Sequence, residues 1–418
     1  MIKKPSLVAR PVTIVTATLK QLPELTKPRR KFIAALIATM LAVRGRVNYR
    51  NLARYGSSCE HTYARHFTQP FPWLAYHAQV IREAVPATHR LLLAQDASFL
   101  PKSGKATWGL GRFYNGCAGR VERGLEISTL AVVDLTQKGA YVLAVEQTPA
   151  TAELKKSGAD STRIDLALQQ IQRAQPHLPT PLRYVAADGY YAKKKYVDGV
   201  VALKLHLVTK LRNDADMRFR YAGKATGQPG RPQVYDGKVD WQDLSRFDEV
   251  ETMDLALGVG VTAYTAELYH RSFKRWLRVV VLVWHTADGK RHHAILATTA
   301  LDCAATELIE MYQGRFHLEF LFRDGKQFAG LSDCQARNAA ALDFHCNAAL
   351  ATVSATRAAM AQVHKKDTPF VFSMASQKQV TFNELFMAEI SAKLNHDFTG
   401  WKIHPAYESL RTYGAIAA

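Results

Sequence analysis

The segment YQGRFHLEFLFRDGK carries four polar side chains among apolar neighbours: Tyr312, Arg315, Glu319 and Lys326. It contains no proline and consists largely of good helix formers, so it predicts a single helix. At about 100° per residue, the four polar side chains fall within roughly 60° of one another. Such a stripe is either an ordinary solvated helix face or part of a site, and other carboxylates in the sequence decide between the two.

The charge of the chain points to an anionic partner. Its 418 residues suffice for about two to four domains, and a hydrophobic content of 48% allows a large core. The formal net charge is +19. So basic a chain favours a polyanion, with nucleic acid as the economical explanation. A membrane surface is the alternative, but no strongly basic amphipathic helix stands out.

Several classes of protein are disfavoured by what the sequence lacks. The longest apolar run, Phe32 to Val43, is too short to span a bilayer and lacks the pattern of a signal peptide. The five cysteines are scattered without a CxxC pair, and the 15 histidines show no HExxH spacing. A disulfide framework and a zinc site are therefore not expected, and a reducing cytoplasm fits, without membrane contact.

Residues 1–88 predict helices. They are expected at Arg30–Arg44, Asn48–Tyr55, Glu60–His66 and Trp73–Val85. Two of them surround a turn and carry Arg50 and Arg54 among aromatic residues, which suits a small DNA-binding helical domain. An ordinary bundle of three or four helices explains the pattern equally well.

The middle of the chain predicts an α/β layer with an insertion. Strands are expected at 91–94, 124–135, 140–150, 183–187 and 205–212, with helices at 161–175 and after residue 188. Residues 213–303 predict an antiparallel β insertion, and residues 304–364 return to helices, including a long one near 339–363. We expect residues 365–418 to form a helical C-terminal region.

Two aspartates stand at the ends of predicted buried strands. Asp96 follows the first strand and Asp188 follows the fourth. Singly, each would more often cap a turn. Together with Glu319, however, they can converge as three carboxylates, which repel one another unless cations neutralise them. A pair of Mg²⁺ or Mn²⁺ ions is the natural compensation and would support phosphodiester chemistry.

The spacing Tyr312-x2-Arg315-x3-Glu319-x6-Lys326 resembles the Tyr-Arg-Glu-Lys signature of a group of bacterial insertion-sequence transposases of the DDE class. The resemblance covers roughly residues 89–363. It implies an RNase-H-like mixed-sheet core, interrupted by the β insertion, with a helical N-terminal DNA-binding domain and a helical C-terminal tail. It also implies that Asp96 and the other two acids hold two Mg²⁺ or Mn²⁺ ions.

The resemblance implies roles for the remaining signature residues. Tyr312 and Arg315 would grip the phosphate beside a flipped base and stabilise a hairpin intermediate, while Lys326 would contact the transferred-strand phosphate. Relatives of this type stack the flipped base on a tryptophan before the last insertion strand. This chain has no tryptophan there, and the candidates are Trp284, His292 and His293.

Further candidate DNA contacts are Lys102, Lys105, Tyr190 and Lys193. The stretch PKSGKAT around the first two lacks the spacing of a P-loop, so no nucleotide cofactor is expected. Aromatic and lysine side chains directly after Asp188 suit phosphate contact, although surface lysines are commoner.

The expected activity is cut-and-paste transposition on double-stranded DNA by a homodimer that pairs the two element ends. One alternative is a metal-dependent DNA nuclease or junction resolvase on the same core. Another is a DNA-binding protein that has lost catalysis.

Overall fold

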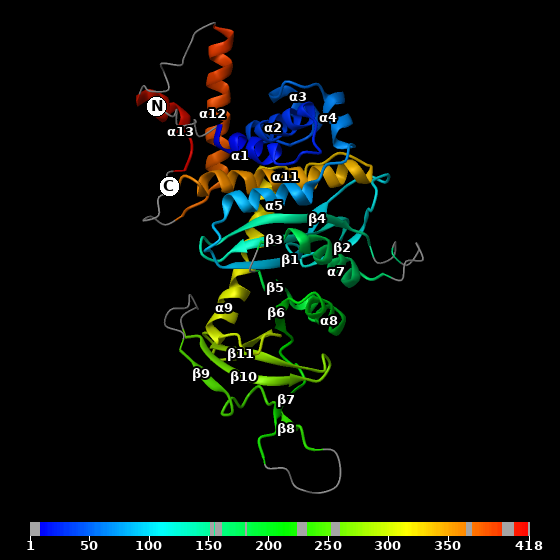
Figure 1. Ribbon diagram of the computed structural model, residues 1–418, viewed down its shortest axis with the longest axis vertical. Coiled ribbons are helices and arrows are strands. Elements are labelled where there is room, and N and C mark those ends of the chain that lie inside the picture. Colours follow the sequence, from blue (N-terminus) through cyan, green and yellow to red (C-terminus); the bar gives the residue numbers. More distant parts are fainter. Residues whose placement is uncertain are drawn as a thin grey trace.

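The computed structural model describes residues 9–150, 154, 161–179, 182–223, 232–251, 260–364, 370–394 and 405–416. Within these ranges the strands form one mixed sheet, with helices gathered mainly at one end of an elongated molecule (Figure 1). The strands are β1 (Leu91–Pro101), β2 (Gly111–Asn115), β3 (Arg120–Asp134), β4 (Gly139–Thr148), β5 (Tyr184–Ala187), β6 (His206–Leu211), β7 (Met217–Arg220), β8 (Tyr235–Lys238), β9 (Asp248–Val250), β10 (Thr262–His270), β11 (Arg275–His285) and β12 (Arg291–Thr298).

The sheet has the order β2-β3-β1-β5-β6-β12-β11-β10-β7-β8, with β4 paired to β3 and β9 paired to β10. β1 is antiparallel to β3, whereas β5 runs parallel to both β1 and β6. The antiparallel run β12-β11-β10 joins β6 through β12, so antiparallel strands are present between residues 213 and 303, as predicted, and they continue the same sheet.

The helices are α1 (Ala9–Lys20), α2 (Lys27–Ala42), α3 (Tyr49–Tyr55), α4 (Glu60–Phe67), α5 (Trp73–Ala84), α7 (Arg163–Ala174), α8 (Lys194–Ala202), α9 (Ala305–Gly314), α10 (His317–Phe328), α11 (Ala339–Ala361), α12 (Met374–Lys393) and α13 (Pro405–Thr412). Local signals explain where several begin. Thr26 and Asn48 cap α2 and α3, and Thr162 with Asp165 forms a capping box at α7. The four N-terminal helices predicted from the sequence are confirmed to within a few residues; α1 was not predicted.

The long helix α11 is the centre of the helical end of the molecule. Nearly every side chain from Ala341 to Ala359 is buried, and the small residues and buried polar side chains of this helix let it pack on all sides. It packs against α1, α2, α5 and β4, and α5 also contacts β4 (Figure 1). In the described sheet β4 pairs with β3 alone, so α5 and α11 cover an otherwise open edge.

Two expectations for the site elements are wrong in detail. β1 was expected to end near Ala94 but continues to Pro101, because β3 pairs with it along its whole length. Asp96 therefore lies within a strand. The helix expected across the signature is two helices, α9 and α10, joined at Arg315 and Phe316. At the joint Phe316 N bonds Gln313 O at 3.0 Å, three residues back, so the turn tightens.

A buried amide fastens α11 to the sheet edge, which yields a stability prediction. Asn347 is 2% exposed; its Oδ1 accepts from His77 Nε2 at 3.2 Å and its Nδ2 donates to Val145 O at 3.3 Å. We expect Asn347→Ala to lower the free energy of unfolding by about 2–4 kcal/mol, because it leaves buried polar partners unsatisfied and opens a cavity. Urea unfolding measures this. Gln362→Ala, at the exposed end of the same helix, should change stability by less than about 0.5 kcal/mol. Equal effects would contradict the argument.

Candidate active site

The strand register brings Asp96 and Asp188 side by side. Gln95 on β1 is paired in parallel with Ala187 on β5, and this pairing is the last one between the two strands. Gln95 is followed by Asp96, and Ala187 is followed by Asp188. Neighbouring strands lie about 4.8 Å apart. The two carboxyl groups therefore leave the sheet at adjacent positions. The prediction that Asp188 directly follows a buried strand is confirmed.

Local hydrogen bonds orient both aspartates. Asp188 caps a short 3₁₀ turn (Gly189–Tyr191), accepting from Tyr190 N at 3.0 Å, and its carbonyl accepts from Thr209 Oγ1 at 3.2 Å. Asp96 accepts from Ala97 N at 2.8 Å. Burial is the main reason that the pKa of Asp96 is raised to about 6; Arg315 opposes the shift, and the charges of Asp188 and Glu319 add to it. Asp188 and Glu319 thus both lie close enough to Asp96 to influence its carboxyl group.

Arg315 connects the third acid to the first. Its guanidinium donates from Nη1 to Asp96 Oδ2 at 3.0 Å and from Nη2 to Glu319 Oε1 at 2.9 Å. The Arg315 side chain is 12% exposed and that of Glu319 is 40% exposed. Because Arg315 sits at the joint between α9 and α10, it reaches β1 while Glu319 lies in the first turn of α10. A single cation therefore neutralises two carboxylates.

Tyr312 completes the cluster, whereas Lys326 does not join it. The Tyr312 ring lies 5.7 Å from the Arg315 guanidinium carbon; burial raises the Tyr312 pKa, Arg315 lowers it, and the charge of Asp188 raises it further. Lys326 stands seven residues beyond Glu319, about 10 Å along α10. It is half-buried near Cys117, and burial lowers its pKa. The predicted stripe is thus divided between the acids and the far end of α10.

The donor set suits a hard divalent cation, but the cation's place is taken by a side chain. In the part of the chain that the structure describes, no three His, Cys, Asp or Glu side chains are close enough together to hold a metal ion. The Arg315 guanidinium is bonded to both Asp96 and Glu319 and so stands between these two acids. Three carboxylates are nonetheless the ligands that Mg²⁺ and Mn²⁺ prefer. The residues fit such ions once Arg315 moves from between the acids.

The other predicted DNA contacts lie in different places. Tyr190 is exposed beside Asp188, and the Lys193 ammonium lies 3.9 Å from its ring centroid. Lys105 is exposed, whereas the Lys102 ammonium donates to the backbone carbonyls of Cys334 and Ala336 and so holds the loop after α10.

The candidates in the insertion and in the N-terminal helices lie outside the acid cluster. On β11 and β12, Trp284 and His292 are cross-strand partners with rings stacked 5.9 Å apart, while His293 Nε2 lies 3.1 Å from Asn213 O. On α3, Arg50 pairs with Glu60 at 3.5 Å, and Arg54 bonds Asn51.

One buried neighbour of the acids was not predicted. Tyr191 is 4% exposed, and its pKa is raised well above 10 by burial, with Tyr196, Asp96 and Asp188 adding to the shift. The buried Tyr191 side chain therefore lies close to both aspartates. The sequence gives no signal that Tyr191 lies near Asp96, because this closeness depends on the parallel pairing of β1 with β5.

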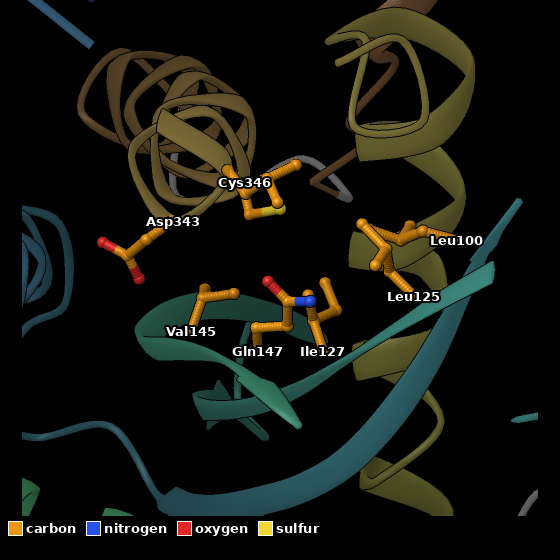
Figure 2. Close-up of a pocket in the computed structure, with 8 residues that line it drawn as sticks. Leu100, Leu125, Ile127, Val145, Gln147, Asp343 and Cys346 are labelled. Carbon is orange, nitrogen blue, oxygen red and sulfur yellow. The ribbon is translucent and has the colours of Figure 1, made fainter. Parts of the chain in front are cut away.

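Neither of the two clearest cavities contains the acids. Figure 2 shows the first, between α11 and the strands, where Cys346 faces Leu100, Leu125 and Val145; it holds about 10 Å³, roughly one water. The second holds about 150 Å³ beside Ala97, which alternation places on the sheet face opposite Asp96. None of Asp96, Asp188 and Glu319 lines either cavity, although Tyr190 and Tyr191 line the second.

Residues 20–274 match the family described as DDE superfamily endonuclease. The matched range includes Asp96 and Asp188 and ends before Glu319. No curated protein matches the chain. Among the helices described, none is long and apolar enough to cross a membrane.

Proposed function

This chain belongs to the DDE superfamily of endonucleases, and on that premise we propose that it is the transposase of a bacterial insertion sequence. It would cut DNA at the ends of its element and join the freed 3′ ends to a target. One observation carries the proposal: Asp96 and Asp188 leave adjacent strands at neighbouring positions, and Arg315 ties Glu319 to Asp96.

The sheet order supports an RNase-H-like core. Strands β4-β3-β1-β5-β6 form one unit that carries both aspartates, and β7 to β12 come between Asp188 and Glu319 in the chain. We propose that residues 89–212 and 304–364 form this core and 213–303 its insertion. Residues 1–88 would bind DNA, with Arg50 and Arg54 among the contacts, and 365–418 would form a helical C-terminal region.

The acids and the other signature residues would have different roles: the acids would bind metal ions, and the other signature residues would bind the DNA phosphate. Asp96, Asp188 and Glu319 would hold Mg²⁺ or Mn²⁺, which when bound activates the attacking water or 3′-hydroxyl and stabilises the leaving oxygen. Arg315 would leave the carboxylates and donate to the phosphate being cut, where a guanidinium fits two oxygens. Tyr312 would hold Arg315 in this second position.

We propose that the flanking strand is released through a hairpin, as in the transposases with the Tyr-Arg-Glu-Lys signature. The stacked rings of Trp284 and His292 support this, because a stacked pair at the strand surface offers a face to a flipped base. Tyr190, Lys193 and Lys326 would contact phosphates around the cut, with His293 and Lys105 further candidates.

A homodimer would pair the two ends at the bacterial nucleoid. On α12, Phe386 and Ile390 are exposed at i and i+4, and the exposed Leu394 follows directly after the helix; such apolar side chains support association through this helix.

The proposal is tested by the products formed from DNA that spans the junctions between the element and its flanks. With Mg²⁺ or Mn²⁺ we expect strand breaks that leave 3′-hydroxyls, a hairpin-sized band on a denaturing gel, and joining of these ends to a second duplex; EDTA should abolish all three. Metal-dependent breaks without joining would instead favour a nuclease or resolvase. Binding without any break would leave a DNA-binding protein.

A further inference from the structure

The hairpin of β2 and β3 presents two positive charges directly opposite each other. The strand register pairs Arg112 with Arg123, and both side chains are exposed. Neither forms a salt bridge with any acidic side chain in the described ranges. Like charges at directly opposed positions of an antiparallel pair destabilise it. The arrangement is therefore suited to an anion that binds between the two guanidinium groups.

The opposite face of the hairpin is anchored and already neutralised. Phe113 packs with Phe99 and Ala150 in a small core. Glu122, the one acidic residue of the segment 111–124, is bonded by Arg120 Nε at 2.8 Å and Asn115 Nδ2 at 2.7 Å. The hairpin is thus held rigid from one side, and Glu122 is not available to Arg112 or Arg123.

Alternation along the strands places the arginine pair on the catalytic face. Thr129 of β3 is the register partner of Asp96, and Arg123 stands six residues from Thr129 on the same strand. Six is an even number, so Arg123 and Asp96 point to the same side of the sheet. At about 3.3 Å per residue the separation is about 20 Å along the strand. Duplex DNA rises 3.4 Å per base pair, so for a duplex whose axis runs along the strand this distance equals about six base pairs.

We propose that this hairpin is a DNA-binding arm, in which Arg112 and Arg123 together grip a backbone phosphate of duplex DNA about six base pairs from the phosphate that is cut. The inference rests on the proposed function, since the distance of about six base pairs is counted from the acids, where the DNA would be cut. Two guanidinium groups offer forked donors to one phosphate, and the anion removes the repulsion between them. Tyr114, 62% exposed, is paired with Val121 on the same face and extends the surface toward the hairpin tip.

The test compares the salt dependence of DNA binding in the full chain. The probe is a random-sequence duplex of about 30 base pairs, followed by fluorescence anisotropy over a range of KCl concentrations. For Arg112→Gln with Arg123→Gln we expect about tenfold weaker binding, and a slope of log K against log salt that is smaller by nearly two. The matched control is Arg120→Gln, on the same hairpin but on the anchored face, which should retain the wild-type slope.

Reversing the charge of Arg112 distinguishes a role in phosphate binding from a role in the stability of the fold. Arg112→Glu creates a cross-strand ion pair with Arg123, so its Tm should equal or exceed that of the wild type while DNA binding falls further than in Arg112→Gln. A lowered Tm would show that Arg112 is structural and would overturn the inference. So would wild-type affinity in the double variant, or an equal loss in Arg120→Gln.

Footprinting on a substrate with a mapped cut gives the position. The double variant should lose protection about six base pairs from the cut and retain protection at the cut itself. Lost protection elsewhere would overturn the inference while leaving the proposed function intact. A wild-type protein that neither binds nor cuts DNA would overturn the proposed function, and this inference with it.

Discussion

Replacing Glu319 with glutamine is expected to reduce DNA cleavage by at least about 1,000-fold while leaving the fold and DNA binding intact. The amide keeps an oxygen that can accept from Arg315 Nη2, so the link from α10 to Asp96 survives. It removes one negative charge of the three that would hold the metal ions, and a neutral amide is a much poorer ligand for Mg²⁺ than a carboxylate. Single-turnover cleavage with Mg²⁺ measures the loss.

Glu310→Gln is the matched control for this experiment. Glu310 lies on α9, its side chain is 39% exposed against 40% for Glu319, and it also pairs with an arginine, Arg90, at 2.6 Å. Its loss should change cleavage by less than about twofold, as for an exposed ion pair of small energetic value. A Glu319→Gln protein that cuts at the wild-type rate would remove Glu319 from the active site, even if Asp96 and Asp188 proved essential.

The main outline of the sheet could be predicted from the sequence because buried strands have a recognisable local pattern of apolar residues. Short apolar segments, residues 91–94 and 184–187, precede Asp96 and Asp188, and such segments predict strands whatever surrounds them. The extension of β1 to Pro101 was missed because it depends on β3, which lies more than twenty residues away in the chain. A strand boundary set by a distant partner leaves little trace in the local pattern.

The sequence predicted that the residues of the candidate site share one stripe, but it did not predict their contacts. Spacing alone placed Tyr312, Arg315 and Glu319 on one stripe, and the structure brings these three together. Spacing could not reveal that Arg315 also reaches Asp96, since that contact joins residues 219 positions apart. Nor could it reveal the joint between α9 and α10. Gly314 packs there so closely on Leu135 that a Cβ atom would lie 2.4 Å from its Cδ2.

The contacts of Arg315 with Asp96 and Glu319 lead to a prediction in which one substitution has opposite effects on metal binding and on cleavage. In the free protein, Arg315 neutralises the carboxylates that the ions would need, so cation and guanidinium compete for Asp96 and Glu319. Arg315→Gln should therefore bind Mn²⁺ more tightly in the absence of DNA, by about tenfold, which corresponds to about 1.4 kcal/mol. Cleavage should nevertheless fall by about 100-fold or more, because the phosphate loses its forked donor.

The two effects are measured separately, Mn²⁺ binding by calorimetry without DNA and cleavage under single-turnover conditions. Arg323→Gln is the control, since Arg323 lies on α10, is 52% exposed and pairs with Asp324 rather than with Asp96 or Glu319. It should leave Mn²⁺ affinity unchanged. If Arg315→Gln bound Mn²⁺ more weakly than the wild type, the guanidinium would be supporting the metal site and not occupying it. Tighter metal binding with slower cutting would mean that DNA must draw Arg315 away before the acids accept their ions, so that the site is completed only on its substrate.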